Sequence, residues 1–207
     1  MSKTRNSDVP MTGIAIGAVL LALLVVFAVV LPRAVGDTGS STGSLILPDS
    51  LPGGYLAADR TAAWKNASGG VKGHEAQIVA QVKAELTYGD RALSKTSKNA
   101  FANRIYLKND GKSIFFVQAF RSAGGAFSPG EISDPSKLQQ GSSVQQLIRV
   151  GDAVCIVDGT VGSPGQIEPS QTQCQRSEGD LTVQVTAPQV AASDVAKVAD
   201  LVLSKVG

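Results

Sequence analysis

The first hydrophobic pattern in the chain is an apolar run from Gly13 to Leu31, which no charged, amide or hydroxyl side chain interrupts. An α-helix needs ~20 apolar residues to cross ~30 Å of hydrocarbon, and the run is close to that length. Lys3 and Arg5 precede it, whereas Arg33 and Asp37 follow it, which favours a cytoplasmic N-terminus by the positive-inside rule. The pattern predicts a signal anchor that spans the cytoplasmic membrane once, with the rest of the chain outside.

A cleaved signal peptide is the alternative for the same run. Its apolar core is usually ~7 to 15 residues long and is followed by an A-x-A-like site. The segment 32–34 fits such a site poorly, and the better match at 26–28 lies inside the run. Gly13 and Gly17 form G-x-x-x-G, a spacing that lets two membrane helices pack closely. Besides the lipid bilayer, a second copy of the chain is therefore a possible partner of this helix, which would make a homodimer.

The segments around this run divide the chain into four parts. Residues 1–12 form a short cytoplasmic tail, 13–31 the transmembrane helix and 32–44 a flexible linker rich in Gly, Ser and Thr. Residues 45–207 are enough for one extracytoplasmic domain with its own core. The domain begins with apolar residues punctuated by proline, from Leu45 to Tyr55, which predicts an extended segment lying on the domain.

The next segments have helical patterns. Residues 56–66, which contain Trp64, have helical composition, and the glycines at 69 and 70 end this segment. Between His74 and Leu86, apolar residues recur at helical spacing, which predicts an amphipathic helix packed on a core. Residues 87–103 are polar and show neither a helical nor a strand-like spacing of apolar residues.

The hydrophobic period then changes from about 3.6 residues to two. Residues 104–108 and 113–121 flank Asp110-Gly111, which predicts a hairpin with a primed turn. Apolar residues at 114–117 point to both faces, so we expect this strand at the centre of the sheet with a helix over one side. Ser122–Ser143 is rich in Gly and Pro and predicts a long loop with one helical turn near 136–140. Further strands are expected at 144–150, 153–158, 171–176 and 181–187.

The C-terminal segment completes the predicted fold. In the last strand, Thr182, Gln184 and Thr186 alternate with apolar residues, which is typical of an antiparallel strand with one wet face. Ser193 is a candidate N-cap for a closing helix lined by valines. The sequence therefore predicts an α+β fold class: a single N-terminal transmembrane helix followed by one extracytoplasmic domain with a mainly antiparallel sheet, packed helices and a C-terminal helix.

Composition narrows the classes of function. A hydrophobic content of 43% with 17% charged residues is typical of a folded domain. The net charge is +2, the basic residues are scattered and only 5% of residues are aromatic, so the basic stripe of a nucleic-acid binder is missing.

The chain has two cysteines, Cys155 and Cys174. If the domain lies outside the cytoplasm, the pair faces an oxidising compartment, where a structural disulfide is the simplest outcome. A redox-active pair is the alternative, but it usually has C-x-x-C spacing near a helix N-terminus. We therefore expect one intradomain disulfide with a stabilising role.

Candidate catalytic groups are few. His74 is the only histidine, so it has no second histidine for a zinc site or a proton relay, and we expect no metal and no cofactor. Two carboxylate pairs, Glu131 with Asp134 and Glu178 with Asp180, remain as candidates for a glycosidase-like site. These pairs lie in turn-like segments, where acidic side chains usually cap or are solvated.

The last fifty or so residues resemble extracytoplasmic domains of actinobacterial envelope proteins. The likeness rests on Cys155 and Cys174, the alternating strand from Leu181 and the terminal helix from Ser193. Those domains include lipoproteins and the external sensor domains of single-pass receptor kinases. The resemblance implies a location in the cell envelope and transfers no functional residue.

These observations favour a non-enzymatic module, tethered to the membrane, that binds a ligand or an envelope protein partner. Its expected binding regions are the segments 122–143 and 159–170. The alternative is an envelope hydrolase that uses carboxylates.

Overall fold

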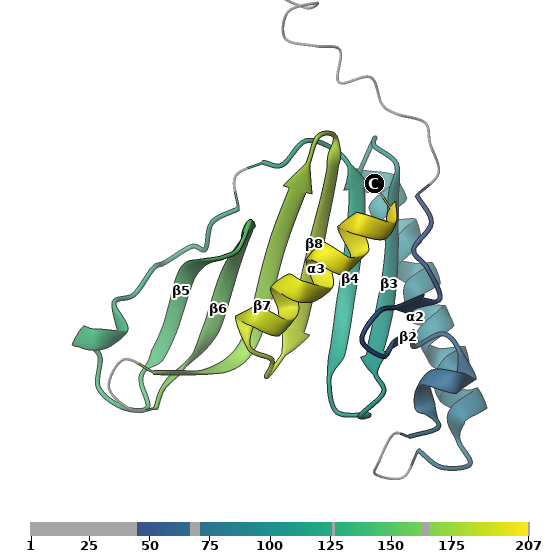
Figure 1. The fold of residues 1–207 in the computed structure, drawn as a ribbon, viewed down its shortest axis with the longest axis horizontal. Coiled ribbons are helices and arrows are strands. Elements are labelled where there is room, and N and C mark those ends of the chain that lie inside the picture. Colours follow the sequence, from purple (N-terminus) through teal and green to yellow (C-terminus); the bar gives the residue numbers. More distant parts are fainter. Residues whose placement is uncertain (1–44, 67–70, 126, 163–165, 207) are drawn as a thin grey trace, which may run out of the picture. The chain divides into compact units, whose positions relative to one another are not determined.

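The computed structural model describes residues 45–66, 71–125, 127–162 and 166–206. Within these residues, eight strands form one antiparallel sheet in the order β1-β2-β3-β4-β8-β7-β6-β5, accompanied by two α-helices (Figure 1). The elements are β1 (Ser50–Leu51), β2 (Tyr55–Ala57), the 3-10 turn η1 (Thr61–Trp64), α2 (Glu75–Thr96), β3 (Phe101–Lys108), β4 (Ile114–Arg121), the 3-10 turn η2 (Pro135–Lys137), β5 (Ser143–Val150), β6 (Ala153–Val161), β7 (Ile167–Glu178), β8 (Leu181–Pro188) and α3 (Ala192–Val206).

The structure contradicts the fold class predicted from the sequence. What it contains is a mainly antiparallel eight-stranded sheet with two α-helices. Neither helix of the described part has both the length and the apolar character needed to cross a membrane. The physical reason is that both helices are amphipathic and use only one side for packing, so that α2, for example, buries only Val79 and Val82. The predicted spanning segment, Gly13–Leu31, and the linker 32–44 lie outside the described residues.

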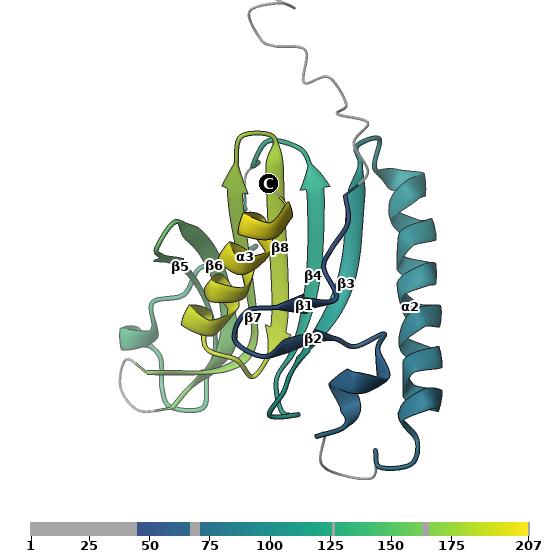
Figure 2. The same cartoon turned by 45° about the vertical axis from the view of Figure 1, so that its right-hand side comes forward.

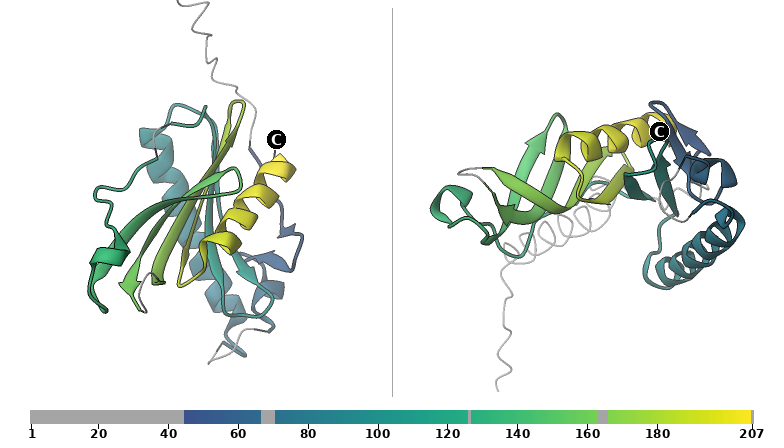
Figure 3. Two further views of the ribbon diagram at one scale, coloured as in Figure 1. Left: turned by 60° about the vertical axis from the view of Figure 1, so that its left-hand side comes forward. Right: turned by 90° about the horizontal axis from the view of Figure 1, so that it is seen from below.

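The hydrophobic core lies between α3 and one face of the sheet (Figures 1 and 3). Pairing places Val117 of β4 beside Val185 of β8, and Val185 beside Cys174 of β7, so apolar side chains from neighbouring strands share this face. The buried valines of α3, which include Val195, Val198 and Val202, pack on them. The helix begins at Ala192, so Ser193 lies in its first turn and is not the predicted N-cap.

The helix α2 lies at the β3 end of the sheet, on the side opposite α3 (Figures 2 and 3). Its Val82 packs with Ala58 and Ile105 in a second, smaller apolar cluster. The predicted amphipathic helix is therefore confirmed, but it continues to Thr96 through residues that carry no clear apolar pattern. The prediction of a helix at 56–66 is wrong, because β2 pairs with β3 there and only η1 is helical.

The predicted strands are confirmed, with differences at their ends. The β3–β4 connection does not form a primed turn, because Gly111 has a positive φ of 68° but Asp110 does not. The long loop after β4 is present and contains η2. The expected loop at 159–170 is largely strand, since β6 extends to Val161 and β7 begins at Ile167.

Candidate binding groove on the open face of the sheet

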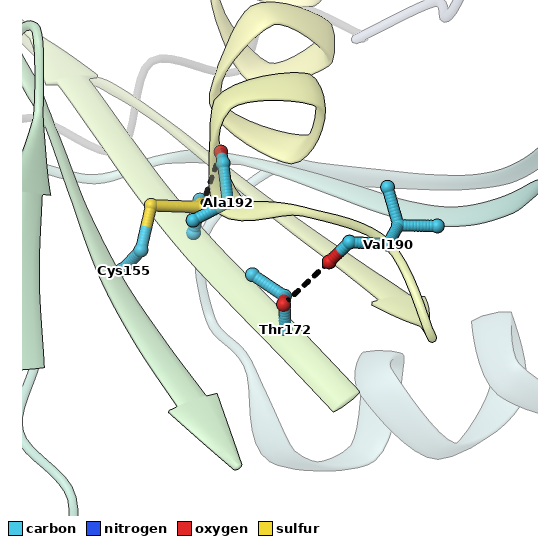
Figure 4. Close-up of a disulfide and its surroundings, with 5 residues drawn as sticks. Cys155, Thr172, Val190 and Ala192 are labelled. Carbon is cyan, nitrogen blue, oxygen red and sulfur yellow. Dashed lines mark hydrogen bonds between the residues drawn. A yellow bond between two sulfur atoms is a disulfide. The ribbon is translucent and has the colours of Figure 1, made fainter. Parts of the chain in front are cut away.

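The two cysteines are joined by a disulfide between β6 and β7 (Figure 4). Cys155 and Cys174 are direct register partners, with Cα atoms 4.0 Å apart, and both are fully buried beneath α3. Near the disulfide, the hydroxyl of the buried Thr172 donates a hydrogen bond of 2.7 Å to the carbonyl of Val190. The predicted pairing is confirmed, and the surroundings are those of a structural link that fixes the segment before α3.

The other candidate side chains of the sequence are exposed, Glu131 and Asp134 among them. His74 is exposed immediately before α2. Asp134 caps η2 by accepting a 3.0 Å hydrogen bond from the backbone N–H of Ser136. No group of three metal-ligating side chains occurs among the residues that the structure describes.

Glu178 and Asp180 flank the β7–β8 turn and line one hollow of about 310 Å³. Both carboxylates are paired with arginine: Asp180 lies 3.2 Å from Arg121, and Glu178 lies 3.9 Å from Arg176. The side chain of Glu178 is 74% exposed and that of Asp180 is 62% exposed, so both are solvated groups at the end of a hairpin.

The face of the sheet away from α3 carries a row of polar side chains beside two hollows. In the described part of the chain, α2 packs on β3 and η1, and neither helix lies over β4 on this face (Figure 3). Pairing places Gln118 of β4 beside Gln184 of β8 and Gln184 beside Gln175 of β7. A row of three glutamine side chains therefore crosses the centre of the sheet on its open face.

Two hollows lie end to end along β4 on this face. The first, of about 200 Å³, is lined by Phe116 and Gln118 of the strand and by Glu85 and Leu86 of α2. The second, of about 300 Å³, is lined by Phe120 and by residues of β7, β8 and the loop that follows β4. The two hollows share no lining residue and follow one another along β4. We call the pair the β4 groove, defined by Phe116, Gln118, Phe120, Glu85, Leu86, Gln175 and Gln184.

Hydrogen bonds hold the far wall of the β4 groove in place. The amide of Gln184 donates to Gln175 over 2.9 Å, and the amide of Gln175 donates to the carbonyl of Gly125 over 3.4 Å. The hydroxyl of Thr182 donates to the carbonyl of Ser122 over 2.8 Å, which ties the start of the loop to β8. The amides are thus oriented by the protein before a ligand arrives.

The floor of the β4 groove carries no charge. Phe116, Gln118 and Phe120 are neutral, and Glu85 on the α2 wall is the one carboxylate among the defining residues. Arg104 also borders the first hollow, but its guanidinium binds Asp49, Asp59 and the carbonyl of Leu47. Electrostatics therefore favours a neutral ligand over a highly charged one.

Another cavity, of about 470 Å³, lies between α2, β3 and the leading segment 45–47. Asp90 on its wall accepts a 2.6 Å hydrogen bond from the amide of Asn103, and burial raises the pKa of this carboxyl. Arg104 donates a hydrogen bond of 2.6 Å to the carbonyl of Leu47, and the hydroxyl of Tyr106 donates one of 2.7 Å to the carbonyl of the next residue, Pro48. These contacts serve to attach the leading segment to the sheet.

Comparison of the chain with protein families, with curated proteins and with solved structures finds no match.

The sequence did not reveal the β4 groove. From the apolar run 114–117 we expected side chains on both faces of this strand to be buried. Phe116 is instead 43% exposed, because α2 packs over β3 and not over β4. The alternation of Thr182, Gln184 and Thr186 was the available signal, and the structure confirms that these side chains share the open face.

Proposed function

We propose that this chain is a non-enzymatic binding module of the cell envelope that uses the β4 groove as its binding surface. It acts on the outer side of the cytoplasmic membrane, attached there through the apolar run Gly13–Leu31 with its N-terminus inside. Its partner is an envelope component, and nucleic acid is excluded as a partner by the scattered basic residues.

The β4 groove is the observation that carries this proposal. A groove with an uncharged floor, preoriented amides and a partly exposed aromatic ring can bind, but its defining residues offer no nucleophile beside a base.

The disulfide supports the proposed location. A buried cross-strand link between the two cysteines of the chain is typical of proteins that fold in an oxidising compartment.

Site-specific photo-crosslinking in living cells tests the proposal. A benzophenone amino acid at position 118 should give adducts of higher mass, because this position lies on the floor of the β4 groove. The same probe at Lys197, an exposed position on α3, is the matched control and should give none. Equal adduct formation at both positions, or none at position 118, would contradict the proposed binding surface.

The alternative function, a carboxylate-dependent hydrolase, has one supporting observation: Glu178 and Asp180 share the hollow at the β7–β8 turn. A hydrolytic activity on envelope material that is lost in both Glu178→Gln and Asp180→Asn would favour it. We expect both variants to cross-link at position 118 as the parent protein does.

A further inference from the structure

We propose that the ligand of the β4 groove is a neutral polysaccharide, a chain of uncharged sugar rings rich in hydroxyl groups. This inference rests on the proposed function and names the class of ligand that the groove selects.

The side chains of the groove match the surfaces of a sugar ring. A neutral pyranose has an apolar C–H face and a rim of hydroxyls that both donate and accept hydrogen bonds. Phe116 and Phe120 supply aromatic surface for the C–H face. The carboxamides of Gln118, Gln175 and Gln184 have both donors and acceptors, as hydroxyl groups require.

The length of the groove favours a polymer over a single sugar. Phe116 and Phe120 point to the same face four positions apart on β4, which corresponds to roughly 13 Å along a strand. The two aromatic rings can therefore contact different sugar rings of one chain.

Two other classes of macromolecule fit the groove less well. An extended peptide is usually held by the free edge of a strand, but β4 is paired with β3 on one side and β8 on the other. An anionic polymer requires unpaired cations, whereas the defining residues of the groove contain one carboxylate, Glu85, and no lysine or arginine.

Affinity electrophoresis of the full-length chain in a zwitterionic detergent tests this inference. The gels contain one of three neutral polymers, namely hydroxyethyl cellulose, dextran or galactomannan, or the anionic polymer polygalacturonate. We expect at least one neutral polymer to retard the protein, to the same extent at low and high salt because no charge pair is involved. No retardation is expected with polygalacturonate.

Matched variants locate the binding. Phe116→Ala and Gln118→Ala should each raise the Kd for the retarding polymer at least tenfold. Leu147→Ala and Gln77→Ala remove an exposed apolar side chain and an exposed amide outside the groove, and should leave the Kd unchanged. Gln118→Glu keeps the shape of the side chain and serves as a control for misfolding. This variant should also weaken binding, while its melting temperature should equal that of the parent.

The inference is wrong if none of the neutral polymers retards the protein, if only polygalacturonate does, or if the Phe116 and Gln118 variants bind as the parent does. Its failure is distinguishable from failure of the proposed function. Adducts at position 118 that a protease degrades, without retardation by polysaccharide, would retain the groove as a binding surface and replace its ligand by a protein.

Discussion

Arg104 connects the leading segment of the domain to the sheet. Its guanidinium donates to Asp59 over 3.0 Å, to Asp49 over 2.6 Å and to the carbonyl of Leu47 over 2.6 Å, and its side chain is 12% exposed. The side chain of Asp59 is only 16% exposed, and its one other ion-pair contact in the described part of the chain is Arg60 at 3.9 Å, which is beyond hydrogen-bond distance. Removal of Arg104 therefore leaves a poorly solvated carboxylate without its hydrogen-bonded cation. Breaking such a pair costs far more than the pair itself contributes when both charges are solvated.

We expect Arg104→Ala to lower the free energy of unfolding by about 2 to 3 kcal/mol, which corresponds to a melting temperature lower by roughly 5 to 10 °C. Arg60→Ala is the control, because among the described residues the side chain of Arg60 hydrogen-bonds only Asp49, and both of these side chains are more than half exposed. Its contact with Asp59, at 3.9 Å, is beyond hydrogen-bond distance. Exposed pairs contribute little, so this variant should melt as the parent does. Equal losses in the two variants would show that burial is not what distinguishes them.

Two carboxyl groups give opposite predictions for the pH dependence of stability. Burial raises the pKa of Asp90 in the folded state, which means that the folded domain favours the protonated carboxyl. The stability that Asp90 contributes is therefore fully present below its unfolded pKa and is lost as pH rises through its folded pKa. Hydrogen bonds from Arg60 and Arg104 lower the pKa of Asp49, so its contribution is present above the unfolded pKa and is lost as pH falls through the folded pKa.

Asp90→Asn retains the oxygen that accepts from Asn103 and removes the charge. This variant should therefore melt at a higher temperature than the parent at pH 7 and at the same temperature near pH 3. Asp49→Asn should melt at a lower temperature than the parent at pH 7, and the difference should shrink toward acid. Thermal unfolding followed by circular dichroism across this pH range measures both, and differences that do not change with pH would disprove the electrostatic origin.

Among the elements, the β6–β7 pair depends on one close backbone approach. Pairing is irregular between Asp158 and Gly159, and a Cβ added to Gly159 would lie 2.2 Å from the carbonyl oxygen of Glu168. Backbone atoms of a paired strand cannot move aside as a flexible side chain does. A glycine is therefore required at this point of β6.

Gly159→Ala should destabilise the domain by about 2 to 3 kcal/mol, because the added methyl group forces the two strands apart. Gly130→Ala is the control, since a Cβ added there meets nothing within 4 Å. Surface substitutions of this kind change stability by less than about 0.5 kcal/mol. Chemical denaturation of the two variants compares them directly, and equal midpoints would show that β7 can shift to accept the methyl group.

The elements also show what sequence patterns can and cannot predict. The alternation that begins at Leu181 requires only local information, because neighbouring side chains of a strand face opposite sides, and β8 agrees with it. The continuation of α2 beyond Leu86 and the exposure of Phe116 depend on where the helix packs, which no local pattern contains. The β4 groove combines residues from four elements and a loop, which only the strand order brings together.

For the whole domain, the disulfide is the main covalent constraint. It links two strands separated by 19 residues in sequence and lies in the core beneath α3. In the chain-entropy model a closed loop of this length stabilises by about 3 kcal/mol, which is a large part of the ~5 to 15 kcal/mol of a typical domain. The stability of the folded domain is therefore coupled to the redox state of its compartment.

The redox state of the two cysteines also reports where the domain folds. If the apolar run Gly13–Leu31 directs the chain across the membrane, alkylation after acid quenching and unfolding should modify neither cysteine of the full-length protein, because both are in the disulfide. A variant that lacks residues 1–31 should remain in the cytoplasm, where both cysteines stay reduced and react once the protein is unfolded. Its melting temperature should be roughly 6 to 12 °C below that of the same variant after oxidation, because the loop of the unfolded chain is no longer closed. Reduced cysteines in the full-length protein, or a disulfide in the cytoplasmic variant, would contradict the proposed location.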